Sequence, residues 1–459
     1  MNGHTSTLPV PRAPALTAHA PAHSKRHSQP LAAALTLGLL VCIWAAVLAF
    51  GATLPLAWSA VEIVVFALLG VLLWGNAGTN PALPFPWKAP AALLLFVALQ
   101  TALVRPRPYR ADEEFLNVLA LVCAFCVSAA VARIPSWRSC LLHGLLALGL
   151  FQAMYGLVQS ITGWQHIFTY EKFYYVSQAT GTYINPNHFA GLLELILPFA
   201  LAFTLERLDQ VHAQSHAVGS FRILGSGRLF SLIFYFFVAL LLFAGILLSR
   251  SRMGMLSIAL TTLTMGLLWL LRSRRTGPRP SIFLLLAAAI LFSLWLGLGP
   301  LLARYSSWDA DLSSRLSVWK DSLVLIRSHP LLGTGLGTFA DSFTRVQTTH
   351  LTRTVDHAHN DYLEFAVEWG LPGAALLFGL ILRLFIRLIR TCLTSATSDS
   401  LYLSLACAGS IFALLVHSLA DFNLQIPANA LLFAVILGFA ASLKTPRPAT
   451  AAPQSGGAS

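Results

Sequence analysis

About twelve apolar stretches, most of them long enough to cross a bilayer, run through the sequence and leave little chain between them. A membrane-spanning helix needs about 20 predominantly apolar residues. The 459 residues are 56% hydrophobic and only 10% charged, whereas soluble domains average about 25% charged residues. We therefore predict an all-α fold, a polytopic integral membrane protein of about twelve transmembrane helices. The spans are expected near residues 31–53, 56–74, 89–104, 115–132, 139–161, 188–205, 229–248, 253–271, 281–299, 371–389, 401–419 and 427–443.

Positive charge gives these spans an orientation. The cytoplasmic loops of membrane proteins collect Lys and Arg, and an even number of spans places both termini on one side. Most of the 30 Lys and Arg residues fall on the side of the N-terminus, so both termini are predicted to be cytoplasmic. This topology accounts for most of the net charge of +12, and no nucleic-acid partner is needed to explain it.

The chain divides into five predicted segments. Both ends are rich in small and polar residues and are predicted to be disordered cytoplasmic tails. Between them lie the first nine spans, one long periplasmic loop that contains amphipathic helices, and the last three spans. The five segments are 1–30, 31–299, 300–370, 371–443 and 444–459. Chemistry is expected where polar residues interrupt the apolar pattern on the outer side.

A short outer turn between the seventh and eighth spans carries two arginines, Arg250 and Arg252. Short outer loops normally avoid positive charge, so this pair is unusual. The planar guanidinium fork suits phosphate oxygens better than a Lys ammonium does. The alternative is that both side chains extend to lipid headgroups. The sequence leaves both interpretations open.

The long outer loop contains a predicted helix over residues 313–326. Arg315, Lys320 and Asp321 fall off its apolar stripe, which favours an amphipathic helix at the membrane interface with its Trp at headgroup depth. A Gly-rich run at residues 333–337 follows and predicts a mobile or tightly turned link. The stripe consists of Leu312, Leu316, Trp319, Leu323 and Ile326.

A polar run over residues 356–364, Asp-His-Ala-His-Asn-Asp-Tyr-Leu-Glu, closes this loop. Its two histidines and three acids are compatible with a metal site, although this spacing does not define one by itself. A histidine without metal can instead act as a general base, oriented by a neighbouring Asp or Asn. A purely structural turn at the entry to a helix is the third possibility.

Three segments together resemble the O-antigen ligase/polymerase family, from roughly the fifth span to the twelfth. The first has His359-Asn360, nine further residues, and then Gly-Leu-Pro-Gly at 370–373. The others are Gly-Thr-Tyr-Ile-Asn-Pro-Asn-His-Phe-Ala-Gly at 181–191 and Ser-Arg-Ser-Arg-Met-Gly at 249–254. Their order and their placement on one membrane face carry the resemblance. Family members have about twelve spans with one large periplasmic loop between the ninth and tenth, as the hydropathy also predicts here.

The resemblance implies glycan transfer from an undecaprenyl-pyrophosphate carrier to an acceptor hydroxyl, such as that of lipid A-core, at the periplasmic face of the inner membrane. It implies no cofactor and no metal. Membrane lipids are the other expected partners. By the family pattern His359 is the general base, and Arg315 with Arg252 or Arg250 binds the pyrophosphate. Possible supporting residues are Asn360, Asp361, His357, His188 and Asn187.

Two sets of alternatives remain at this point. Within the family, a repeat-unit polymerase and a protein O-oligosaccharyltransferase use the same donor chemistry and differ in the acceptor. Outside it, a transporter or flippase for lipid-linked sugars also suits twelve spans, and Glu62 and Glu194 inside predicted spans favour such a pathway. However, no inverted repeat is visible, and the polar residues gather on one face and not at the midplane.

Overall fold

The computed structural model describes residues 23–77, 85–106, 108, 110–218, 226–273, 305–348 and 355–443. Within this part of the chain, nine helices are long and apolar enough to cross a membrane. Two shorter apolar helices, α3 and α14, lie among them. The prediction of an all-α polytopic membrane protein is confirmed. The predicted ninth span, 281–299, lies outside the described residues.

The described part of the first half of the chain forms six α-helices and one two-stranded hairpin. Helix α1 begins at His23, inside the segment 1–30 that the sequence predicts to be a disordered tail, and Pro30 lies within the helix. The elements are α1 (His23–Leu48), η1 (Phe50–Ala52), α2 (Pro55–Asn76), α3 (Lys88–Leu103), α4 (Ala111–Val131), α5 (Pro135–Thr162), β1 (His166–Ile167), β2 (Tyr170–Glu171) and α6 (Pro186–Val218).

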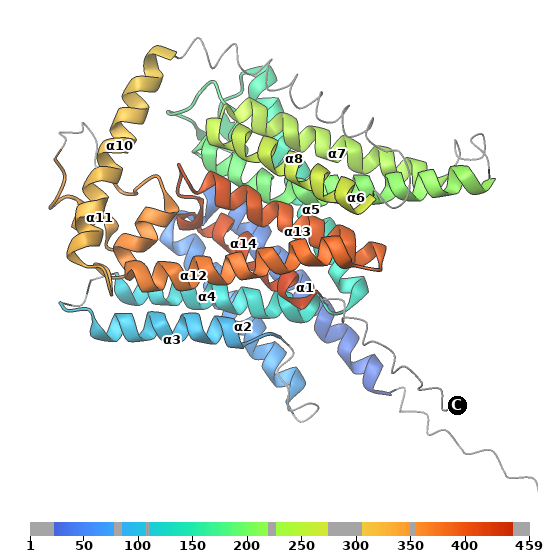
Figure 1. Ribbon diagram of the computed structural model, residues 1–459, viewed down its shortest axis with the longest axis horizontal. Helices are drawn as coiled ribbons and strands as arrows, with labels where there is room; N and C mark the ends of the chain where they lie inside the picture. Colours follow the sequence, from blue (N-terminus) through green and yellow to red (C-terminus); the bar gives the residue numbers. More distant parts are fainter. Residues whose placement is uncertain are drawn as a thin grey trace, which may run out of the picture.

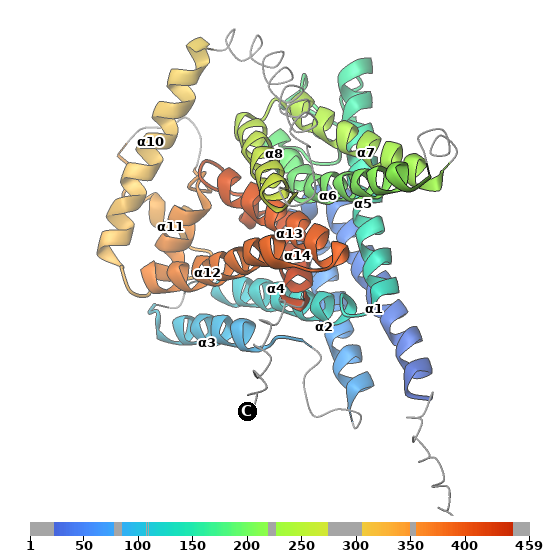
Figure 2. The ribbon, with the colours of Figure 1, turned by 45° about the vertical axis from the view of Figure 1, so that its right-hand side comes forward.

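The second half adds further spanning helices and two helices that lie outside them. Figure 1 shows α10 across one end of the bundle, with α11 beside it, and Figure 2 shows the same arrangement from another side. The elements are α7 (Gly227–Ser249), α8 (Arg252–Ser273), α10 (Tyr305–Ser328), α11 (Phe339–Phe343), α12 (Asp361–Thr394), α13 (Ser398–His417), η3 (Asn423–Gln425) and α14 (Pro427–Ser442).

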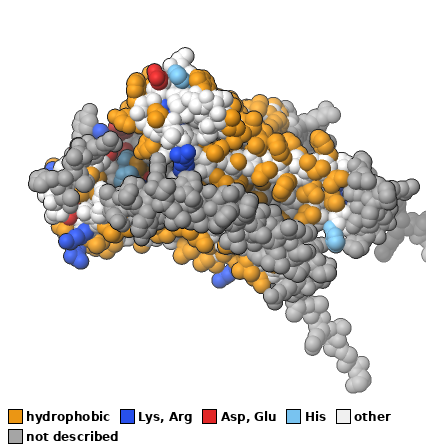
Figure 3. All heavy atoms as spheres, turned by 90° about the horizontal axis from the view of Figure 1, so that it is seen from above, with side chains coloured by type: hydrophobic (Ala, Val, Ile, Leu, Met, Phe, Trp, Pro, Cys, Tyr) orange, Lys and Arg blue, Asp and Glu red, His pale blue; other side chains and the backbone are white. Residues whose placement is uncertain are grey.

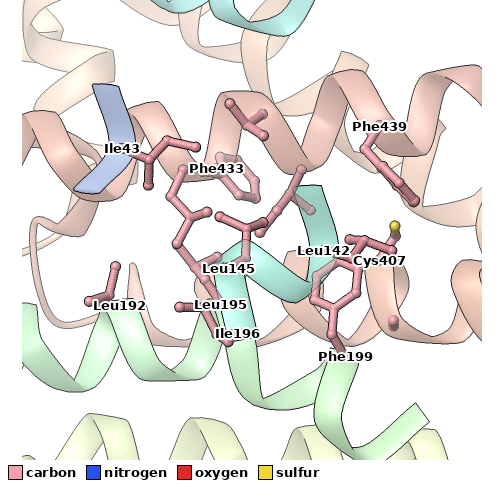
Figure 4. Close-up of a cluster of buried hydrophobic side chains, with 14 of the residues drawn as sticks. Ile43, Leu142, Leu145, Leu192, Leu195, Ile196, Phe199, Cys407, Phe433 and Phe439 are labelled. Carbon is pink, nitrogen blue, oxygen red and sulfur yellow. The ribbon is translucent and has the colours of Figure 1, made fainter. Parts of the chain in front are cut away.

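Helix α6 occupies the centre of the bundle. Almost all of its most apolar stretch is buried, whereas only a third or less of the corresponding stretches of α2, α7 and α12 is buried. Figure 4 shows side chains of α1, α5, α6, α13 and α14 meeting around it, including Ile43, Leu145, Ile196 and Phe433. On the face seen in Figure 3, hydrophobic side chains cover much of the surface that belongs to described residues. Such a surface requires a lipid environment.

Helix α10 covers a second, smaller hydrophobic core at the end of the bundle. Val318 and Leu325 on its inner side are buried against the start of α12. The residues of the predicted apolar stripe do not share one buried face. Leu316 and Leu323 are exposed, whereas Ile326 is buried. Trp319 donates a hydrogen bond from its indole nitrogen to the carbonyl oxygen of Ala358, at 3.0 Å. The helix is thus fixed to the chain just before α12.

A kink at Gly370 divides α12 into two parts. Its φ of 71° lies in the left-handed region, which favours glycine. A Cβ at Gly370 would stand 2.5 Å from the carbonyl oxygen of Leu331, and one at Gly333 would stand 2.3 Å from that of Glu368. The Gly-rich link is therefore a tight turn packed against the kink. This turn holds the first turns of α12 against α10. Helix α12 begins at Asp361, ten residues before the predicted span at 371–389.

Candidate functional site

His359 lies immediately before α12, in a strained backbone conformation. Its φ is 49°, and left-handed backbone costs a non-glycine residue roughly 1–2 kcal/mol. Asn360 is the N-cap of α12, because its side-chain oxygen accepts a hydrogen bond from the amide of Leu363 at 3.0 Å. Its amide group also donates to the carbonyl oxygen of Leu419, at 2.9 Å. Asn360 therefore holds the turn that aims the His359 side chain.

The His359 ring packs edge-on against Phe422, with ring centroids 4.9 Å apart. Its Nδ1 atom is buried and has no hydrogen-bond partner among the described residues. Burial lowers the pKa of His359 below its usual value. The nearby Asp421 opposes this shift, whereas Arg315 adds to it. The imidazole is therefore neutral at neutral pH and able to accept a proton.

Two more imidazoles surround the same Phe422 ring. His357 stacks on it with centroids 4.2 Å apart, and His188, near the start of α6, meets it edge-on at 4.8 Å. The turn before α6 is capped by Asn185, whose side-chain oxygen accepts from the amide of Asn187 at 2.9 Å. His188 and His359 therefore contact the same Phe422 ring, although they are far apart in the sequence.

His357 is an ion-pair residue in this arrangement. Its Nδ1 lies 2.7 Å from a carboxylate oxygen of Glu364, and the other oxygen accepts from the Ala358 amide at 2.8 Å. Burial alone would lower the pKa of His357, but Glu364 outweighs it and the pKa is raised. His357 is therefore protonated more readily than His359. Among the described residues, no three His, Cys, Asp or Glu side chains are arranged to hold a metal ion.

Asp421 is the buried anion of the cluster. One of its oxygens lies 4.0 Å from His188 Nε2, and the other lies 3.6 Å from His417 Nε2. Burial would raise its pKa, but the nearby imidazoles of His417, His188 and His359 hold the pKa well below its usual range. Asp421 is consequently an ionised carboxylate that faces several imidazoles.

A buried pair supports Asp421 from inside the bundle. His417 Nδ1 lies 2.9 Å from a carboxylate oxygen of Glu194 on α6, and Ser257 donates a hydrogen bond to the same carboxylate at 2.8 Å. Glu194 was noted in the sequence as an ionisable residue inside a span, but its partner was not predicted. The spacing of His417 and Asp421, four residues apart at the end of a helix, is the signal that was available.

Asp361 is fully buried and turned toward the segment between α13 and α14. Its carboxylate accepts from the Ser418 hydroxyl at 2.7 Å and from the Leu424 amide at 3.3 Å. Its own amide donates to the carbonyl oxygens of Ser418 and Asp421, both at 3.1 Å. Asp361 thus joins the start of α12 to the segment that carries Asp421 and Phe422.

Arg315 reaches the cluster from α10. Its guanidinium donates a hydrogen bond to the carbonyl oxygen of Ala420, directly before Asp421. The side chain is half-buried, and its charge contributes to the lowered pKa of His359. Arg315 therefore lies beside the segment that carries Asp421, and its charge acts on His359.

Arg250 and Arg252 lie at the same end of the bundle, at the turn between α7 and α8. Arg250 ends α7 with a φ of 56° and is exposed, whereas Arg252 begins α8 and is half-buried. The first turn of α8 packs closely against α6. A Cβ at Gly254 would stand only 2.9 Å from the Glu194 carboxylate. Glu194 binds His417, so this turn is anchored to the network that supports Asp421.

Together, the helical bundle and the polar cluster at one end define a multi-pass membrane protein with a candidate active site at one face. Residues 237–378 match the family model described as O-antigen ligase. The match begins in α7 and ends in α12, and it includes Arg250, Arg252, Arg315, His357 and His359. The predicted resemblance to this family is confirmed over that segment, which supports an enzyme of the O-antigen ligase/polymerase type. No curated protein matches the chain significantly.

Proposed function

We propose that this protein transfers a glycan from undecaprenyl pyrophosphate to an acceptor hydroxyl, in the manner of an O-antigen ligase. The observation that carries this proposal is His359, a neutral imidazole with a buried, unpartnered nitrogen, held beside Asp421 and Arg315. Such a transfer needs a base, an anion that stabilises the protonated base, and a cation that stabilises the leaving phosphate.

In the proposed reaction, His359 accepts the proton of the acceptor hydroxyl. The acceptor oxygen forms a bond to the anomeric carbon as the bond from that carbon to the pyrophosphate oxygen breaks. The pyrophosphate leaves with the bonding electron pair, and the anomeric configuration inverts. Arg315, with Arg252 or Arg250, stabilises the negative charge that develops on the leaving group, so no metal ion is required.

The experiment that tests this function uses the detergent-purified protein and a lipid-linked glycan. With an acceptor such as lipid A-core present, free undecaprenyl pyrophosphate should appear as the glycan reaches the acceptor. A transporter would leave the lipid–glycan bond intact. In a deletion strain, accumulation of full-length polymer on the carrier would indicate a lost ligase, and accumulation of single repeat units would indicate a lost polymerase.

We place the site on the periplasmic face of the inner membrane, and cysteine labelling tests this orientation. Lys320 is exposed on α10. In a chain whose six cysteines are replaced by Ser, Lys320→Cys should react with a membrane-impermeant maleimide added from the periplasm. Labelling that appears only after the inner membrane is disrupted would place His359 in the other compartment.

The two arginines of the α7–α8 turn should differ in importance. Arg252 is half-buried at the first turn of α8, whereas Arg250 is exposed. We expect Arg252→Lys to lower transfer by at least about tenfold, because Lys keeps the charge but lacks the bidentate fork. Arg250→Lys is the matched control and should lose less. Equal, near-normal rates in both variants, with Ala also tolerated, would favour headgroup anchoring.

Asp421 should control the pH dependence of transfer. The rate requires neutral His359, so it should rise with pH through the pKa of His359, which lies below about 6.5, and reach a plateau at neutral pH. Asp421 raises that pKa, so Asp421→Asn should move the acid limb to lower pH and also lower the plateau, because the base is weaker. A lower plateau with an unmoved limb would assign Asp421 a purely structural role.

A further inference from the structure

A long groove lies between α3, α4, α12 and α14. Its volume is about 1790 Å³, and most of its lining side chains are apolar, including Leu121, Val122, Leu377 and Leu437. One end reaches Leu424, next to the candidate active site, and the other reaches Thr394, the last residue of α12. The groove therefore follows the bundle for most of the length of the spanning part of α12.

Basic residues line the groove at the end opposite the candidate active site. Arg383, Arg387 and Arg390 come from the last turns of α12, and Lys88 begins α3. Arg387 is half-buried and donates a hydrogen bond to the carbonyl oxygen of Ala440, whereas Lys88, Arg383 and Arg390 are exposed. The described residues that line the groove include no Asp or Glu. Positive charge thus gathers at one end of an otherwise apolar channel.

This combination fits one class of ligand. Guanidinium groups bind phosphate oxygens, and a groove of apolar side chains accommodates acyl chains. Basic pockets between transmembrane helices bind the headgroups of anionic phospholipids. A polyprenyl chain whose pyrophosphate lies near His359 would place its phosphates at the other end of the groove. The position of the arginines therefore favours a lipid from the leaflet opposite the candidate active site.

We propose that this groove is a binding site for an anionic phospholipid. The phosphate lies against Arg383 and Arg390, and the two acyl chains extend along α4 and α14 toward Leu424. In the orientation proposed above, the lipid comes from the cytoplasmic leaflet. The site is separate from the transfer chemistry, and it holds α3 and α4 against α12 through the lipid.

Native mass spectrometry of the full-length, detergent-purified protein tests this site, with phosphatidylglycerol as the probe. We expect saturable binding of one phosphatidylglycerol, which neither phosphatidylcholine nor inorganic phosphate displaces. The double substitution Arg383→Gln and Arg390→Gln should weaken binding about 30-fold, since each basic residue near a membrane surface contributes about fivefold. The matched control is Arg133→Gln, an exposed arginine at the end of α4 that does not line the groove.

A second variant tests the acyl-chain part of the site without changing charge. Gly379 lines the groove, and a Cβ at this position would meet nothing within 4 Å. Gly379→Leu should therefore fold, since Leu is a better helix former than Gly, and should reduce lipid binding by at least about tenfold. Unchanged binding in both groove variants, or equal loss in Arg133→Gln, would overturn the proposal. Displacement of phosphatidylglycerol by undecaprenyl phosphate would assign the groove to the donor instead.

Discussion

His359→Gln is expected to lower the rate of glycan transfer by about 10²–10⁴-fold, the range that a lost general base typically costs. Gln retains hydrogen bonding but cannot accept the proton of the acceptor hydroxyl. The turn that carries residue 359 is held by Asn360 and Asp361 through contacts that do not involve the imidazole. The variant should therefore insert, fold and bind donor at normal levels. Transfer is measured at saturating donor with purified protein.

His357→Gln is the matched control for this variant, because both histidines contact Phe422. It removes the ion pair with Glu364, so some loss is expected, but a smaller one than for His359→Gln. A metal site would give another result: both substitutions would abolish transfer, a chelator would do the same, and added divalent ion would restore activity.

Arg315→Lys is expected to lower transfer by about 10²-fold or more, the cost of removing one preorganised charge-stabilising donor. The guanidinium donates to the carbonyl oxygen of Ala420 and also presents its charge to the site. Lys supplies one ammonium group and cannot make both contacts with the same planar geometry. Initial rates at varied donor concentration separate the effect on turnover from the effect on binding.

Arg327→Lys provides the control on the same helix, since Arg327 is exposed near the end of α10. It should transfer glycan at the normal rate. If Arg315→Lys and Arg315→Ala both retain near-normal turnover, Arg315 has no role in stabilising the leaving group, and its contact with Ala420 only positions α10.

The features that are local in sequence could be predicted. Apolar runs of sufficient length predict spanning helices because the bilayer requires them. The helix over 313–326 follows from its apolar spacing, and Asn360 before α12 is a favoured capping residue. The sequence could not predict which apolar residues of α10 are buried, because the exposed Leu316 and the buried Ile326 fit the same helical spacing.

The long-range partners of the site could not be predicted from one sequence. Asp421 and Phe422 belong to a short connection between two helices, and no spacing rule relates them to His359 or to His188. The pair formed by Glu194 and His417 likewise depends on how α6 packs against α13. Hydropathy indicates that a helix crosses the membrane, but it does not specify its neighbours.

The most direct test of the central claim is a single-turnover reaction of the purified protein with a labelled glycan on undecaprenyl pyrophosphate, in the presence of a chelator and an acceptor. The wild-type protein is expected to release one undecaprenyl pyrophosphate for each labelled glycan that reaches the acceptor. His359→Gln is expected to bind the same amount of donor and to release at least about 100-fold less in the same time. Wild-type-like release by His359→Gln at equal protein levels would contradict the assignment of His359 as the base.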